Sequence, residues 1–133
     1  MEPQSSAPQG VHLDRIDLVI PGRAEYVAVA RLAAAAIAGR MTFSFDEIED
    51  LKVAVGEVCS AAILAGSPKV QIAFEVHAGQ LDITVVHTPT KAPRPRREPD
   101  LDKLLVQVLM DDVLTRADGA EHLTRMSKRV AKT

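Results

Sequence analysis

Two neighbouring stretches in the middle of the chain place apolar side chains at every second position. In residues 70–76 the apolar positions are Val70, Ile72, Phe74 and Val76, and residues 81–86 repeat the pattern. Alternation of this kind is typical of strands that bury one face. The link 77–80 contains Gly79 and is short enough to join the two strands as a hairpin. We therefore predict an antiparallel pair of strands with one face against a core.

The remaining elements follow from helical spacing and from turn residues. Ser44 and Glu47 form a capping box that starts one helix, and Gly66 and Pro68 end it. By the same criteria we expect three helices, near 23–40, 45–65 and 100–111, and three further strands, at 13–20, 113–116 and 121–128.

The third predicted helix has the cleanest apolar stripe of the chain. Leu101, Leu104, Leu105, Val108 and Leu109 follow the i, i+3, i+4, i+7, i+8 spacing of an amphipathic helix. We expect this stripe to face the sheet. The element order β-α-α-β-β-α-β-β then predicts a two-layer α/β (α+β) sandwich, with a mostly antiparallel sheet and all helices on one of its faces.

Composition narrows the classes of protein. A chain of 133 residues with 47 % apolar residues suits one domain, and we expect a disordered tail at 1–11 and a single domain at 12–133. The net charge of −2 disfavours direct nucleic-acid binding. Cys59 is the only cysteine, which fits a reducing cytoplasm. The longest apolar run, 32–38, is too short to span a membrane.

Two segments carry a resemblance to a known family. Residues 21–32 read PGRAEYVAVARL and residues 45–59 read FDEIEDLKVAVGEVC. Both resemble RsbW/SpoIIAB-type anti-sigma factors, which are serine/threonine kinases of the GHKL (histidine-kinase-like) ATPase superfamily, and residues 106–113 resemble that family's last long helix. The resemblance implies a histidine-kinase-like (Bergerat-type) ATPase fold from about residue 15 to residue 130.

The resemblance also implies where an ATP site would lie. Family members carry a Glu-x-x-x-Asn pair, in which Glu is the base and Asn binds Mg²⁺, then an Asp-x-Gly-x-Gly turn that holds adenine, and a glycine-rich lid over the phosphates. In this chain only Glu57 matches. The other corresponding positions are degenerate: Ala61, His87, Pro89, Asp100 and Asp102.

These differences predict that ATP and Mg²⁺ are no longer bound. Ala61 has no oxygen for Mg²⁺, and Asp100 and Asp102 would place carboxylates where phosphates bind. The stretch between Gly79 and Gly119 contains no glycine that could cradle phosphate. We therefore expect no cofactor, no metal and no catalytic residue. Glu57 is then more simply a solvent-facing helix residue.

The histidines and the basic stretch 91–97 each have a simpler interpretation than a functional site. The four histidines are scattered along the sequence, no pair of them has metal-ligand spacing, and we expect His87 in an exposed loop. The basic stretch 91–97 can attract an acidic partner or phosphate, but a solvated loop is the simpler interpretation. It also offers a nucleic-acid alternative, which the acidic balance disfavours.

The resemblance implies partners rather than substrates. Arg31 matches the family arginine that contacts both sigma factor and anti-anti-sigma protein, and Glu25 would lie at the rim of that surface. We expect a cytoplasmic anti-sigma factor that sequesters a sigma factor and is released by an anti-anti-sigma (STAS) protein. The alternative is an active ATP- and Mg²⁺-dependent kinase that phosphorylates the anti-anti-sigma protein. A homodimer is expected, through either the sheet edge or the helices.

Overall fold

The order of elements agrees with the sequence prediction. The computed structural model describes residues 14–91 and 101–131, so the predictions for the tail 1–11, for Asp100 and for most of the basic stretch lie outside the described residues. The elements are β1 (Asp14–Pro21), a short 3-10 helix η1 (Ala24–Tyr26), α1 (Val27–Ala38), α2 (Phe45–Leu64), β2 (Lys69–His77), β3 (Gln80–His87), α3 (Leu101–Leu109), β4 (Asp112–Asp118) and β5 (Glu121–Arg129).

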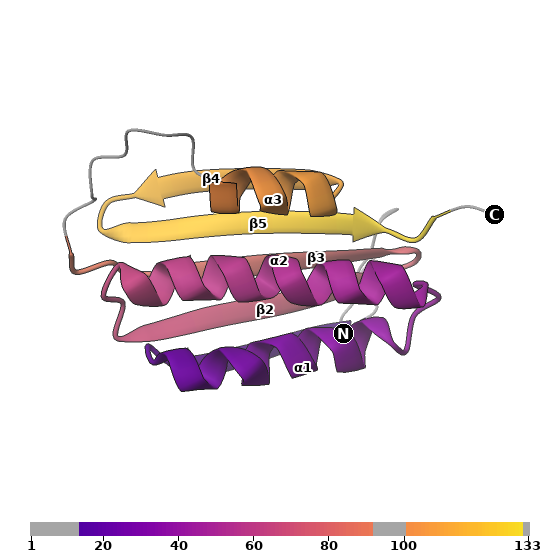
Figure 1. Cartoon of the computed structure of the whole chain (residues 1–133), viewed down its shortest axis with the longest axis horizontal. Coiled ribbons are helices and arrows are strands. Elements are labelled where there is room, and N and C mark those ends of the chain that lie inside the picture. Colours follow the sequence, from indigo (N-terminus) through magenta and orange to yellow (C-terminus); the bar gives the residue numbers. More distant parts are fainter. Residues whose placement is uncertain (1–13, 92–100, 132–133) are drawn as a thin grey trace, which may run out of the picture.

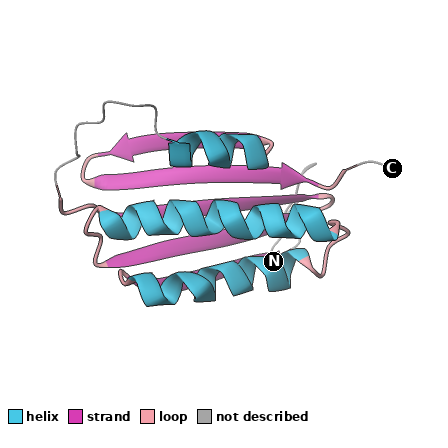
Figure 2. Cartoon of the chain, viewed as in Figure 1, coloured by secondary structure: helices cyan, strands magenta, loops and turns pink. Residues whose placement is uncertain are grey.

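The five strands form one sheet in the order β1-β2-β3-β5-β4, and every neighbouring pair is antiparallel. The predicted hairpin joins β2 to β3 in a register that pairs Phe74 with Ile83. Gly79 in its turn has φ +74°, a conformation that glycine adopts without strain. The three helices cover one face of the sheet (Figures 1 and 2). The predicted two-layer sandwich is therefore confirmed.

The core lies between the helices and the alternating face of the sheet. Phe74, Ile83 and the β5 residue Met126 are fully buried on that face. Ala30, Ala34 and Ala38 of α1 are also fully buried, because small side chains let α1 approach α2 and the sheet closely. Cys59 of α2 belongs to the same core.

The start and the end of α2 follow the predicted signals. The Ser44 hydroxyl accepts a hydrogen bond from the Glu47 backbone N–H at 3.1 Å, and the Glu47 carboxylate accepts one from the Ser44 N–H at 2.7 Å. This capping box satisfies two N–H groups that the helix leaves without partners. Gly66, with φ +83°, turns the chain away after the last helical residue.

The predicted orientation of α3 is wrong. Its buried residue is Val106, followed by Met110 just after the helix, whereas Leu104 is 47 % exposed and Val108 is 80 % exposed. The apolar stripe that the sequence shows so clearly lies on the face of α3 that points away from the sheet. In the ranges that the structure describes, no helix is long and apolar enough to cross a membrane.

Candidate functional site

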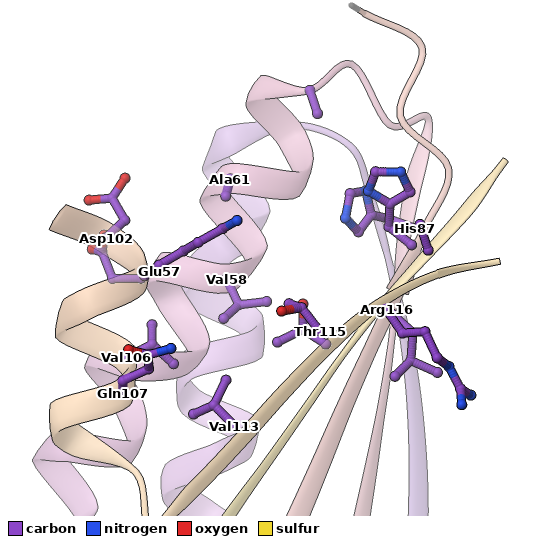
Figure 3. Close-up of a pocket in the computed structure, with 16 residues that line it drawn as sticks. Glu57, Val58, Ala61, His87, Asp102, Val106, Gln107, Val113, Thr115 and Arg116 are labelled. Atoms are coloured by element: carbon purple, nitrogen blue, oxygen red, sulfur yellow. The ribbon is translucent and has the colours of Figure 1, made fainter. Parts of the chain in front are cut away.

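A cavity of about 400 Å³ lies between α2, α3 and the end of the sheet formed by β4 and β5. Figure 3 shows Glu57, Val58 and Ala61 entering it from α2, and Asp102, Val106 and Gln107 from α3. The other labelled residues of the wall come from β3 and β4: His87, Val113, Thr115 and Arg116. Glu57, which matches the ATP-binding pattern, thus shares one cavity or its rim with three residues at which the sequence departs from that pattern: Ala61, His87 and Asp102.

Two carboxyl groups meet at the side of the cavity where α2 faces α3. Glu57 is half-buried and lines the cavity together with Asp102 of α3 (Figure 3). Burial and the neighbouring Asp102 raise the pKa of Glu57, while the nearby Arg31 opposes that shift. The expectation that Glu57 simply faces solvent is therefore wrong.

Residue 61 contributes no polar atom to this arrangement. Ala61 lies one helical turn after Glu57 and is exposed at the rim of the cavity. Its methyl group offers no oxygen to a cation, and the acidic neighbour that acts on Glu57 is Asp102, from another helix. In the described ranges, no group of three or more histidine, cysteine, aspartate or glutamate residues is placed to hold a metal ion.

Two imidazoles lie on the opposite side of the cavity. His87 is the last residue of β3, and its Nδ1 lies 2.7 Å from the hydroxyl of buried Ser67. The His122 ring packs edge-on against it, with 5.5 Å between ring centroids. Burial, together with the charge of His122, lowers the pKa of His87. His87 is half-buried rather than in an exposed loop, so that expectation was wrong.

The chain after His87 is held against the end of α2. The backbone N–H groups of Thr90 and Lys91 both donate to the Ala65 carbonyl at 3.0 Å, and the Thr90 hydroxyl donates to the Gly66 carbonyl at 2.8 Å. Pro89, within this segment, is half-buried. The resemblance places an open, glycine-containing turn in this stretch. In this chain the stretch instead contains a proline and is hydrogen-bonded to the end of α2.

Arg31 lies outside the cavity, on the neighbouring helix α1. Its guanidinium packs over Gly56 of α2, and a Cβ added at Gly56 would collide with it. The side chain remains exposed and acts electrostatically on Glu57. Glu25 is also exposed and accepts a hydrogen bond of 2.8 Å from Arg23. Glu25 is thus engaged by Arg23 rather than by Arg31, and neither Glu25 nor Arg31 lines the cavity.

Ser67 and His122 are site residues that the sequence interpretation missed. His122 reaches His87 because β3 and β5 pair in a register that puts these two residues opposite each other. Ser67 belongs to the turn between α2 and β2, far from His87 in sequence. Neither residue belongs to a motif. Knowledge of the β3–β5 pairing would have placed His122 beside His87, whereas no local signal in the sequence indicates Ser67.

Comparison with known proteins agrees with this architecture. The family model of the histidine kinase-like ATPase domain matches residues 20–128, and the chain belongs to that family. Within it the similarity is to RsbW proteins, as segments 21–32 and 45–59 predicted. The serine-protein kinases RsbW of Bacillus thuringiensis (strain Al Hakam) and Bacillus anthracis (strain A0248) are each 37 % identical to it over 76 residues.

The sequence matches cover a smaller share of this chain than the structural match does. The aligned region is 54 % of this chain and 48 % of each RsbW protein, so the chain spans about half the length of the curated relatives it matches. The crystal structure of the RsbU and RsbW domains of a Mycobacterium tuberculosis protein superposes with a TM-score of 0.70. That match covers 87 % of this chain and 32 % of the other at 10 % identity, and it shows the shared fold.

Proposed function

We propose that this chain is a cytoplasmic anti-sigma regulatory factor that sequesters a sigma factor and has lost ATP binding and kinase activity. An anti-anti-sigma (STAS) protein would release the sigma factor by competing for the same regulator. The observation that carries the proposal is the contact between Glu57 and Asp102 inside the cavity. The base position of the family is retained, but it faces a second acid.

The side chains in the cavity do not fit Mg-ATP. A carboxylate on α3 repels phosphate in a poorly solvated site, and Ala61 cannot replace the metal-binding amide. His87 stands where the family has a carboxylate for adenine, and its Nδ1 is already engaged by Ser67. Each of the three contacts that hold the nucleotide in the family would have to be rebuilt from other residues. No catalytic step is therefore assigned to the cavity.

The exposed face of α1 supports a partner-binding role. Leu32 is 65 % exposed and Val29 is 43 % exposed, on either side of Arg31 in sequence. Exposed apolar residues beside an arginine are a common composition of protein interfaces. Without catalysis, the switch between sigma factor and anti-anti-sigma protein would rest on their relative affinities for this surface.

An active serine/threonine kinase that phosphorylates the anti-anti-sigma protein is the second candidate. Two observations favour it: Glu57 still lines a cavity of about 400 Å³ at the expected place, and the similar Bacillus proteins are named serine-protein kinases. This candidate requires a nucleotide and Mg²⁺ held by groups other than those of the family pattern.

One reconstitution separates the two candidates. The tagged chain first captures its partners from the native cytosol, and the recovered sigma factor and STAS protein are then purified and mixed with it. We expect the sigma-factor complex to form without nucleotide, and the STAS protein to displace the sigma factor without being phosphorylated. Phosphate transfer from ATP to a serine of the STAS protein would establish the kinase instead. Recovery of no transcription-related partner would contradict the anti-sigma function.

A further inference from the structure

The cavity between α2, α3 and the sheet has a size that suits a small organic molecule. Its volume of about 400 Å³ lies in the range that is usual for small-molecule sites, which are mostly apolar with a few polar groups. Val58 and Ala61 of α2, Val106 of α3 and Val113 of β4 supply apolar surface to its wall (Figure 3). These short side chains leave room for a ring or a short aliphatic body between the helices and the sheet.

Two acidic side chains line the cavity from the helix side. Glu57 comes from α2, and Asp102 comes from the first turn of α3 (Figure 3). Burial and the charge of Asp102 raise the pKa of Glu57, and the shift remains upward although Arg31 of α1 opposes it. Lys103 also lines the cavity and is exposed. A positive charge brought next to Glu57 and Asp102 favours their ionised forms and is attracted by them.

The sheet side of the cavity offers hydrogen bonds rather than charge. Thr115 of β4 lies opposite Thr124 of β5, and both threonines line the cavity. His87 uses its Nδ1 for the contact of 2.7 Å with the Ser67 hydroxyl. Burial and the charge of His122 lower the pKa of His87, so the His87 ring is neutral at neutral pH. Hydroxyl groups and a neutral imidazole suit an uncharged polar edge of a ligand.

We propose that this cavity binds a small organic cation, with its ammonium group at Glu57 and Asp102 and an uncharged ring against the apolar wall and the threonine hydroxyls. The charge of such a ligand is opposite to that of a nucleotide, so the two acids that repel phosphate attract it. The inference goes beyond the proposed function, because it concerns the cavity and not the α1 surface. It holds or fails whether or not a sigma factor binds.

A pair of ring compounds of opposite charge tests the charge preference. Tryptamine joins a planar ring to a primary ammonium group, and indole-3-propionate is its matched anion. Titration of the full chain at neutral pH, followed by the amide resonances of the cavity residues, is expected to show saturable tryptamine binding. Tryptamine should bind at least about tenfold more tightly than indole-3-propionate. Absence of tryptamine binding at millimolar concentration, or equal binding of the two compounds, would overturn the proposal.

Variants of α2 test the location. Glu57→Gln removes one negative charge and is expected to weaken tryptamine binding at least about tenfold. Glu49→Gln is its matched control, because Glu49 lies on the same helix, pairs with Lys52 at 3.2 Å and does not line the cavity. Affinity in this control should equal that of the wild type. Equal losses of affinity in Glu57→Gln and Glu49→Gln would contradict the assigned site.

A second variant tests the location by size instead of charge. Ala61→Phe fills the rim of the cavity, and it should leave the fold intact because Ala61 is exposed. Tryptamine binding is expected to fall at least about tenfold in this variant, with an unchanged circular dichroism spectrum. Wild-type affinity in both Ala61→Phe and Glu57→Gln would show that tryptamine binds elsewhere and would overturn the proposal.

Discussion

At the scale of single residues, Glu57 is the cavity residue that both the sequence resemblance and the structure single out. The sequence identifies it as the one retained member of the family's catalytic set, and the structure places it against Asp102. Because burial and this second acid raise the pKa of Glu57, the group tends to hold a proton that an exposed glutamate would release.

Glu57→Gln is expected to change the pH dependence of stability. Glutamine imitates the protonated carboxyl but has no proton to lose. In the wild type the folded-state pKa lies above the ordinary 4.5, so the free energy of unfolding falls as the pH rises from 4.5 through the raised value. Urea unfolding should therefore show similar stabilities at pH 4 and a more stable variant at pH 7. A stability difference that stays constant between these pH values would contradict this assignment.

Arg31 is the residue on which the partner interaction is expected to depend. Truncation of an interface arginine commonly costs about 2 kcal/mol or more, and about 1.4 kcal/mol corresponds to a tenfold change in affinity. We expect Arg31→Ala to weaken sigma-factor binding at least about tenfold in a calorimetric titration. Thermal stability should stay within about 0.5 kcal/mol, since the side chain is exposed.

A substitution at Gly56 tests the role of Arg31 in partner binding independently of Arg31→Ala. Gly56→Ala adds a methyl group where the Arg31 guanidinium lies, so the arginine must move while its charge is retained. It should weaken partner binding in the same direction without loss of helix stability, because alanine is the better helix former. Arg40→Ala, at an exposed arginine just after α1, is the control. Unchanged affinity in Arg31→Ala would remove this residue from the interface.

At the scale of elements, α3 shows how amphipathicity can mislead. The strongest apolar stripe in the sequence points outward, and a single valine with the following Met110 supplies the core contacts. Periodicity identifies a helix and an apolar face, but it does not say whether that face meets the chain's own sheet or another molecule.

Two valines of α3 distinguish the observed orientation from the predicted one. Val106 is 4 % exposed and Val108 is 80 % exposed, yet each substitution to alanine removes the same atoms. We expect Val106→Ala to lower the free energy of unfolding by about 1.5 to 2 kcal/mol, through lost burial and a small cavity. Val108→Ala should change it by less than about 0.5 kcal/mol. Urea unfolding at high dilution would show the reverse order if the stripe faced the sheet.

Most of the fold, and less of the site, could be predicted from the sequence. The β2–β3 hairpin and the capped helix α2 are specified locally, by alternation around Gly79 and by the Ser44 and Glu47 side chains. The contacts of Glu57 with Asp102 and of His87 with Ser67 join residues that are distant in sequence. They depend on how α3 and the strands are placed, which no local pattern determines.

At the scale of the whole molecule, the fold keeps the cavity apart from the exposed surface of α1. The cavity lies between α2, α3 and the β4–β5 end of the sheet, and the surface around Arg31 lies on α1. Under the proposed function the chain acts through that surface alone, and its output depends on the concentrations and affinities of its partners. Nucleotide should then have no effect on the complexes it forms.

Calorimetric titration of the purified chain with Mg-ATP tests whether nucleotide binding is lost. We expect no saturable heat up to millimolar nucleotide, because Ala61, His87 and Asp102 stand where the family has the metal ligand, the adenine contact and the phosphate site. Ala61→Asn alone should not restore binding, since the other two differences remain. Clear micromolar binding by the unmodified chain would contradict the account and would establish a nucleotide site built on contacts other than those of the family.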